Sequence, residues 1–86
     1  MDKYIQHGNN GEYFLSINGL IMDSYVAKYL GLSLGEYTDI LKRHNSRHTI
    51  ILGECYFKDR SDIEEALKEL EPYIVMATLM GELIWD

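Results

Sequence analysis

Residues 26–41, VAKYLGLSLGEYTDIL, predict two short helices that meet at a tight turn. Apolar residues recur at helical spacing on both sides of Gly31, a residue type that readily adopts the left-handed conformation with which helices commonly end. Ser33 and Glu36 then form a capping-box pattern, in which each side chain accepts a hydrogen bond from the backbone N–H of the other. Asp23 or Ser24 is expected to cap the first helix.

The spacing of the two helices resembles a helix-turn-helix motif over residues 23–42. In that motif a small residue lets the helices touch, a glycine makes the turn and apolar side chains fill the angle between them. The positions that carry the resemblance are Val26, Ala27, Leu30, Gly31, Leu32, Tyr37 and Ile40. The resemblance implies that the second helix presents its N-terminal residues to DNA bases. Glu36 and Asp39 occupy those exposed positions here, and their carboxylates would be repelled by phosphates.

The first third of the chain has the residue alternation of a β-hairpin. Residues 4–6 and 13–17 flank the turn-rich cluster 7–11, and apolar and polar side chains alternate along the second arm. The dipeptide Asn18-Gly19 favours a type I′ turn, across which residues 20–22 can pair back. We therefore expect two antiparallel strands and a short third one before the helices.

The second half of the chain predicts a strand, a helix and a final strand. Residues 49–57 are rich in β-branched and aromatic side chains, with a bend expected at Gly53. The acidic turn that begins at Ser61 predicts a helix, which Pro72 should end. Residues 73–80 are apolar throughout and favour a central strand over the competing prediction of a kinked continuation of the helix.

The element order β-β-(β)-α-α-β-α-β predicts an α+β fold, with a small antiparallel sheet packed on one face by about three helices. A length of 86 residues predicts a single compact domain over residues 1–86, without room for a large buried active site. No apolar run approaches the roughly 20 residues of a membrane helix, and the N-terminus does not resemble a signal peptide. Together with a single cysteine, these features predict a cytoplasmic protein without membrane contacts.

The acidic residues predict a protein partner. Fourteen acidic against eight basic residues give a net charge of −6, which argues against general affinity for nucleic acid or anionic membrane. Such a surface suits a larger protein with a basic surface, although a solvated helix face is the simpler interpretation. The residues expected to meet the partner are Glu36, Asp39, Asp62, Glu65 and Glu69.

A basic cluster after the second helix keeps a nucleic-acid role open as the alternative. Its members Lys42, Arg43, Arg47 and His48 could clamp a phosphate backbone. The simpler interpretation is that Lys42 and Arg43 neutralise the C-terminus of the helix.

No pattern in the sequence predicts catalysis, a cofactor or a metal. His44 and His48 are four residues apart and Cys55 follows, but that spacing matters only on a continuous helix, and the single cysteine leaves the chain without a cysteine pair. Cys55 lies in a strand pattern, where a small buried cysteine is common. Surface histidines and a core cysteine are therefore expected, and the protein is not expected to be an enzyme.

In size, acidity and compactness the whole chain is similar to the small proteins with which phages and other mobile elements inhibit host defence, including anti-CRISPR inhibitors. That resemblance of style implies a non-enzymatic protein of the host cytoplasm that occludes a basic, nucleic-acid-handling site on a larger host protein. The alternative is a small helix-turn-helix-like DNA-binding regulator that acts as a dimer. A third hypothesis is a structural or assembly subunit, possible as a homodimer through residues 73–85, which include Trp85.

Overall fold

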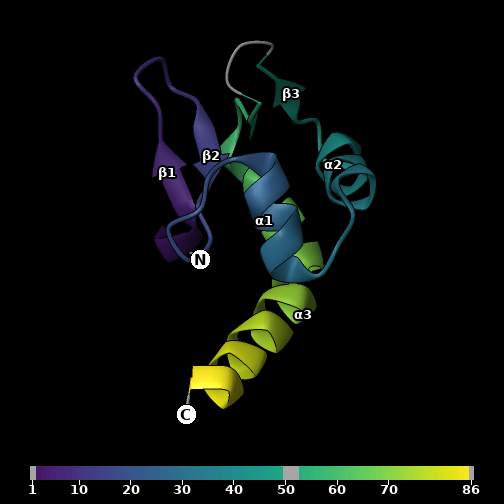
Figure 1. Cartoon of the computed structure of the whole chain (residues 1–86). Helices are drawn as coiled ribbons and strands as arrows, with labels where there is room; N and C mark the ends of the chain where they lie inside the picture. The colour runs from purple at the N-terminus through teal and green to yellow at the C-terminus, as the bar shows by residue number, and fades with distance from the viewer. Residues whose placement is uncertain (1, 50–52, 86) are drawn as a thin grey trace.

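In the residues that the structure describes, three α-helices combine with two small antiparallel strand pairs (Figure 1). The computed structural model describes residues 2–49 and 53–85, with side chains described as far as Gly81, so the predicted strand residues 50–52 lie outside it. After a short 3₁₀ turn the elements are β1 (Ile5–His7), β2 (Tyr13–Leu15), α1 (Asp23–Leu30), α2 (Leu34–Arg43), β3 (Arg47–His48), β4 (Cys55–Tyr56) and α3 (Arg60–Trp85). The predicted α+β class is confirmed.

The strands form two hairpins that are joined at one point. β1 pairs with β2 so that Ile5 lies opposite Leu15, and β3 pairs with β4. Reciprocal backbone hydrogen bonds of 2.8 and 2.9 Å between Tyr13 and Phe57 connect the two pairs. Within the described part of the strand predicted for residues 49–57, only β4 and the bridge at Phe57 form. β3 lies before the predicted range.

The turn predicted at Asn18-Gly19 is confirmed. Both residues have positive φ angles, 53° and 76°, as a type I′ turn requires. Ile17 and Leu20 exchange both backbone hydrogen bonds across the turn, at 3.0 and 2.9 Å. The short third strand predicted for residues 20–22 reduces to this single bridge.

The helix pair forms as the opening stretch of sequence predicts. Gly31 ends α1 with a φ of 74°, and its backbone N–H bonds back to carbonyls of the last turn. Ser33 and Glu36 make the reciprocal capping box at the start of α2. Local hydrogen bonds therefore fix both the end of α1 and the beginning of α2.

The side-chain cap predicted at Asp23 or Ser24 is wrong. Met22 occupies the N-cap position of α1 and makes no side-chain capping bond. Asp23 is instead the first residue of the helix and is buried, and its Oδ1 accepts a hydrogen bond from the backbone N–H of Cys55 at 3.1 Å. Asp23 therefore connects α1 to β4.

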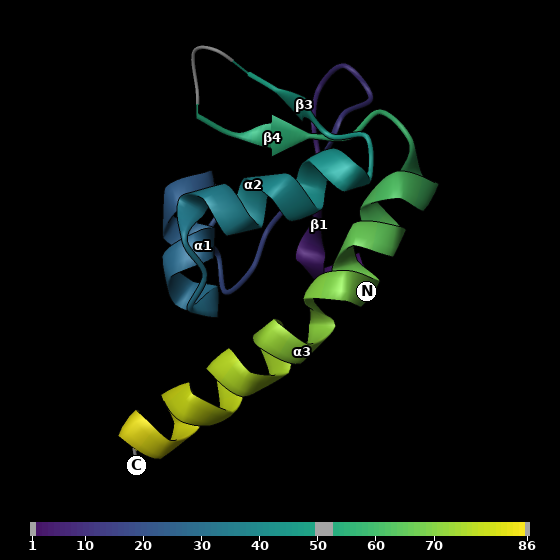
Figure 2. The same cartoon turned by 90° about the vertical axis from the view of Figure 1, so that its right-hand side faces the viewer.

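α3 is one helix from Arg60 to Trp85, so the helix end predicted at Pro72 and the strand predicted for residues 73–80 are both wrong. The helix continues because its buried stripe crosses the proline with unbroken helical spacing. That stripe consists of Ile63, Ala66, Leu67, Leu70 and Ile74, each at most 4% exposed. The helix bends near its middle (Figure 2), where Pro72 lacks an N–H and crowds the carbonyl of Lys68.

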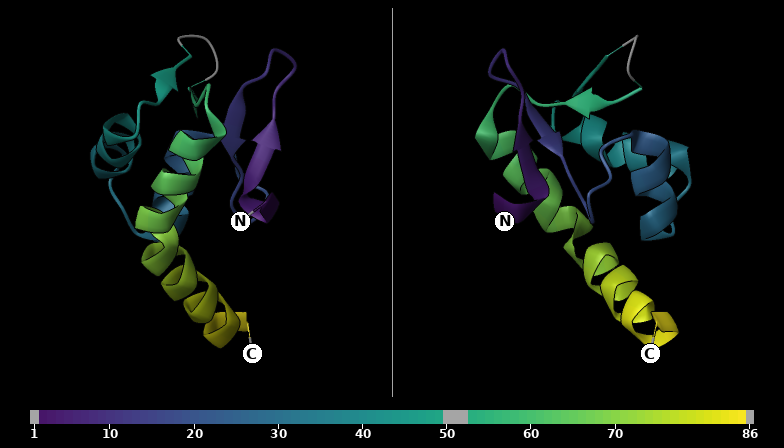
Figure 3. Two further views of the ribbon diagram at one scale, coloured as in Figure 1. Left: turned by 180° about the vertical axis from the view of Figure 1, so that it is seen from behind. Right: turned by 60° about the vertical axis from the view of Figure 1, so that its left-hand side comes forward.

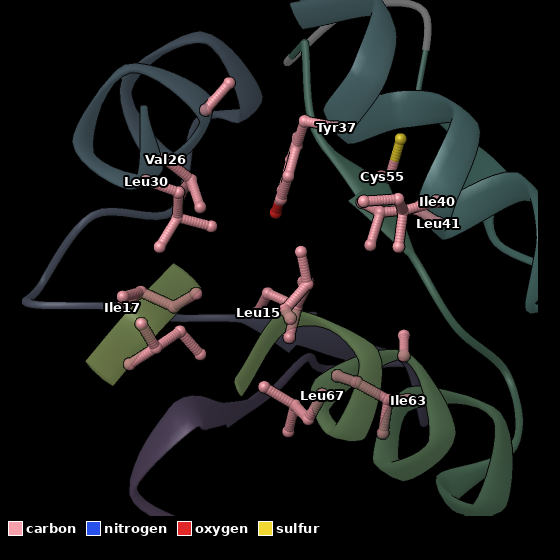
Figure 4. Packing of buried hydrophobic residues seen from close by; sticks show 14 of the residues in the cluster. Leu15, Ile17, Val26, Leu30, Tyr37, Ile40, Leu41, Cys55, Ile63 and Leu67 are labelled. Carbon is pink, nitrogen blue, oxygen red and sulfur yellow. The ribbon is translucent and has the colours of Figure 1, made fainter. Parts of the chain in front are cut away.

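The core lies between the three helices and the inner faces of the hairpins. Figure 4 shows Leu15 above the first half of α3, with the hydroxyl of Tyr37 directed toward the centre of the cluster. Phe57, with 0% exposure, fills the core where the two hairpins join. Helices and strands are thus held by one shared cluster of apolar side chains.

The second half of α3 projects away from the rest of the protein (Figure 3). This projection accounts for an elongated shape, with extents of 40 × 24 × 21 Å. We call the segment from Tyr73 to Trp85 the C-terminal arm. Across the described residues, no helix is long and apolar enough to cross a membrane.

Candidate functional site

The acidic residues predicted to meet a partner lie on two helices that touch. On α2, Glu36 and Asp39 belong to a row that ends at Arg43, with the i, i+3, i+7 spacing of one helix face. The matching row on α3 consists of Asp62, Glu65 and Glu69. The two rows meet at an ion pair between Arg43 and Glu69, and we call this pair of rows the acidic junction.

Several carboxylates of the acidic junction already have partners within the protein. Glu69 also accepts a hydrogen bond from His44 Nε2 at 2.9 Å, and the bonds from His44 and Arg43 hold the pKa of Glu69 below its usual value. Backbone and side-chain hydrogen bonds from Ser33 likewise lower the pKa of Glu36. These carboxylates therefore remain ionised at neutral pH, and their charges are fixed in position.

Two further acids of the junction are exposed and make no bond to another element of the described residues. Asp39 is exposed on α2, and Glu65 is exposed on α3. Glu65 contacts only Lys68 of its own helix among the ion pairs of the described residues, at 3.2 Å. Because exposed pairs of this kind contribute roughly 0.2–1 kcal/mol, a partner can displace the lysine at small cost.

The structure does not bring the predicted basic cluster together as one free surface. Arg43 is engaged with Glu69, and His48 lies with its Nδ1 3.8 Å from the sulfur of Cys55. Lys42 and Arg47 are exposed. Two of the four proposed phosphate contacts are thus already occupied by other groups of the chain.

A second cluster gathers around Cys55, and sequence reasoning found only part of it. The pairing of β3 with β4 sets His48 opposite Cys55, and the first residue of α1 brings Asp23 to the same place. One potential ligand atom from each of these three side chains lies within 4.8 Å of the others. His44, which the sequence grouped with His48, points instead to Glu69.

The electrostatics of this cluster favour a protonated thiol. Burial raises the pKa of Cys55 to about 12, and the neighbouring Asp23 carboxylate adds to the rise. Burial, followed by the charge of Asp23, also raises the pKa of Tyr37. Since the thiolate is the nucleophile, Cys55 is poorly prepared for covalent catalysis at neutral pH.

Asp23 escaped sequence reasoning because an acid at the start of a helix ordinarily acts as a cap. The sequence signal of another role is that Asp23 is the single acidic residue in the mainly apolar segment 20–27. Its contact with Cys55 spans 32 residues and depends on the tertiary fold.

Comparisons with known proteins give no relative of this chain. No protein-family model matches it, and neither a curated protein nor a solved structure matches it significantly.

Proposed function

We propose that the protein is a non-enzymatic binding protein that occludes a basic, nucleic-acid-handling site on a larger host protein. Its setting is the host cytoplasm, as for inhibitors encoded by phages or other mobile elements. The observation that carries this proposal is the acidic junction, where rows of carboxylates on α2 and α3 meet at the Arg43–Glu69 ion pair.

The spacing of the carboxylates supports the proposal that they occupy a groove that otherwise binds the phosphates of a nucleic acid. A row at i, i+3 and i+7 places one charge every roughly 4.5–6 Å along a helix, whereas one DNA strand carries a phosphate every roughly 3.4 Å. The row on α3 is therefore a sparser line of negative charge that a groove lined with Lys and Arg can accept. On α2, Glu36 and Asp39 add two further negative charges before the row ends at Arg43. The net charge of −6 favours encounter with such a groove over long distances.

Fixed geometry also supports the proposal. The contacts of Glu69 with Arg43 and His44 hold the end of α2 against α3, and Asn45 Nδ2 lies 3.5 Å from Asp62 Oδ1 nearby. Both rows are thus oriented before a partner binds, which reduces the entropy lost on association.

Exchanging Asp39 and Glu65 for lysine tests this face. These residues are chosen because Glu36 and Glu69 have structural roles. Immobilised wild type should capture a host protein from a lysate, and excess duplex DNA should release it. The Asp39→Lys/Glu65→Lys variant should capture at least about 10-fold less of this protein, because placing lysines against a basic site costs several kcal/mol.

The matched control is Glu54→Lys/Glu71→Lys, which changes the net charge equally on other parts of the surface. It should retain most of the capture. Equal loss in both variants would mean that only net charge matters, and unchanged capture by Asp39→Lys/Glu65→Lys would refute the choice of face.

A DNA titration separates this proposal from the regulator alternative. Fluorescence anisotropy with generic duplex DNA at low salt should give no binding by the wild type. Micromolar binding that weakens steeply with salt and is lost in Arg47→Glu would favour the regulator instead.

The C-terminal arm favours a second candidate function, a structural or assembly subunit. Ile74 of the arm is buried in the core, but five other apolar side chains among its described residues are unusually exposed for a helix, at 40–60%: Tyr73, Val75, Met76, Leu79 and Met80. No charged residue occurs between Glu71 and Glu82. A specific interface between two copies needs roughly 1,000 Å² of buried surface in total, and this apolar face of the arm is the surface that could provide it.

Light scattering tests assembly through the arm. Wild-type protein should form a dimer at high concentration, and Met76→Glu/Leu79→Glu should be monomeric because charges would enter the apolar contact. Tyr25→Glu/Leu34→Glu, which alters exposed apolar residues on α1 and α2, is the matched control and should remain dimeric. A monomeric wild type at every concentration would contradict an obligate assembly role.

A further inference from the structure

The side chains of Asp23, His48 and Cys55 converge from three separate elements. Asp23 comes from the start of α1, His48 from β3 and Cys55 from β4. The Cys55 sulfur lies 3.8 Å from His48 Nδ1, and the ligand atoms of all three residues lie within 4.8 Å of one another. The set offers one carboxylate, one imidazole and one thiol, which are the three main classes of zinc ligand.

The hydrogen bonding of Asp23 leaves one oxygen available. Oδ1 is held by the backbone N–H of Cys55, whereas Oδ2 is buried and has no hydrogen-bond partner. Asp23 as a whole is only 4% exposed. A buried carboxylate oxygen without a partner is costly, and a cation at this point would remove that cost.

A second unpartnered atom lies in the same place. Within the described part of the chain, Asp23 Oδ2 and Ser46 Oγ are the two buried side-chain oxygens that lack a partner. Ser46 also lies beside Cys55, where it lowers the pKa of the thiol against the larger rise that burial causes. Both unsatisfied atoms thus border the cysteine, rather than being scattered through the core.

We propose that Asp23, His48 and Cys55 bind a zinc ion. Zinc is favoured because imidazole and thiolate together select a borderline-soft metal over magnesium or calcium. The Cys55 proton would pass to solvent as the sulfur coordinates the ion.

The distances suit tetrahedral coordination after small side-chain movements. At usual zinc bond lengths, neighbouring ligand atoms are separated by roughly 3.3–3.6 Å. The Cys55–His48 separation of 3.8 Å is already close to this value. The backbone bond to Asp23 Oδ1 would orient the carboxylate, as hydrogen bonds around metal ligands commonly do.

Two of the three proposed ligands border an open depression. Cys55 and His48 form part of its wall, and the rest comes from α2 residues Leu34, Gly35, Thr38 and Lys42. Water or a small anion can enter from this side. An ion bound here would link β3 and β4 to α1, and metal ions that connect separate elements in this way stabilise small domains.

Cobalt titration of the full chain under reducing conditions tests the site. Co²⁺ should produce a sulfur-to-metal charge-transfer band and the intense visible bands of tetrahedral cobalt, and Zn²⁺ should displace both. His48→Gln, Cys55→Ser and Asp23→Asn should each weaken cobalt binding at least as much as the loss of an outer-shell partner does, about 10–100-fold. His7→Gln is the matched control, since His7 lies on β1 outside the cluster, and it should bind as the wild type does.

His48→Gln is the decisive variant because His48 is exposed and its loss leaves the core intact. Zn²⁺ should raise the thermal midpoint of the wild type and of His7→Gln but not that of His48→Gln, while far-ultraviolet circular dichroism confirms that all three are folded. A wild-type cobalt spectrum without the charge-transfer band would overturn the proposal. Equal cobalt affinity of wild type and His48→Gln would also overturn it.

Discussion

Replacing Phe57 with alanine should lower the free energy of unfolding by about 3–5 kcal/mol. Phe57 is completely buried, and its backbone makes both hydrogen bonds that connect the second hairpin to Tyr13 of the first. The substitution leaves a cavity where the hairpins and the helices share one core. A small domain has about 5–15 kcal/mol of total stability, so this loss is a large fraction of the total.

Urea denaturation followed by circular dichroism measures this loss. The control is Tyr25→Ala, which removes an aromatic ring that is 56% exposed on α1 and should change stability by no more than about 0.5 kcal/mol. A similar small effect of Phe57→Ala would mean that the hairpin junction is not part of the cooperative core.

Replacing Pro72 with alanine should stabilise the protein by about 1–3 kcal/mol. A proline in a helix interior costs roughly 3 kcal/mol relative to alanine, because it removes one hydrogen bond and clashes with the preceding turn. Part of the gain is offset because proline restricts the unfolded chain. Burial of Ile74 on the stripe of α3 shows that the helix continues through this position despite the cost.

Thermal denaturation of Pro72→Ala and Pro72→Gly distinguishes a continuous helix from the end predicted by sequence. Both variants restore the N–H, but glycine is about 1 kcal/mol less favourable than alanine inside a helix. The alanine variant should therefore have the highest thermal midpoint, with glycine below it. If alanine were neutral or destabilising, Pro72 would be better described as a helix terminator.

The acidic junction and the Cys55 cluster can be tested independently. Asp39→Lys/Glu65→Lys changes no residue of the cluster, and His48→Gln changes no residue of either acidic row. If Asp39→Lys/Glu65→Lys loses partner capture but still binds cobalt, its fold and its metal ligands are intact. The loss of capture is then due to the acidic junction itself.

Local chemistry made the helix pair and the Asn18-Gly19 turn predictable. The capping box needs only Ser33 and Glu36, three residues apart, and the turn needs only two residues that accept positive φ. Such features are decided by hydrogen bonds and backbone sterics within one turn of chain, so the sequence contains all the information about them.

The C-terminal half of α3 could not be predicted in the same way. Residues 73–80 have no polar positions at regular intervals, so neither a period of 2 nor one of 3.6 is visible, and β-branched residues favour the strand. The helix is selected by the packing of Ile74 beside Leu70 and Leu67 against the core. Tertiary contacts thereby override both the β propensity and Pro72.

The sequence by itself determined the α+β class, the paired helices α1 and α2, and the positions of the acidic rows along their helices. Only the tertiary structure decided that the rows meet at Arg43 and Glu69, and that Asp23 reaches Cys55. The physical reason is the range of the interactions. Helix caps and turns depend on neighbours along the chain, whereas these contacts join residues 26 and 32 positions apart and form only when the core brings their elements together.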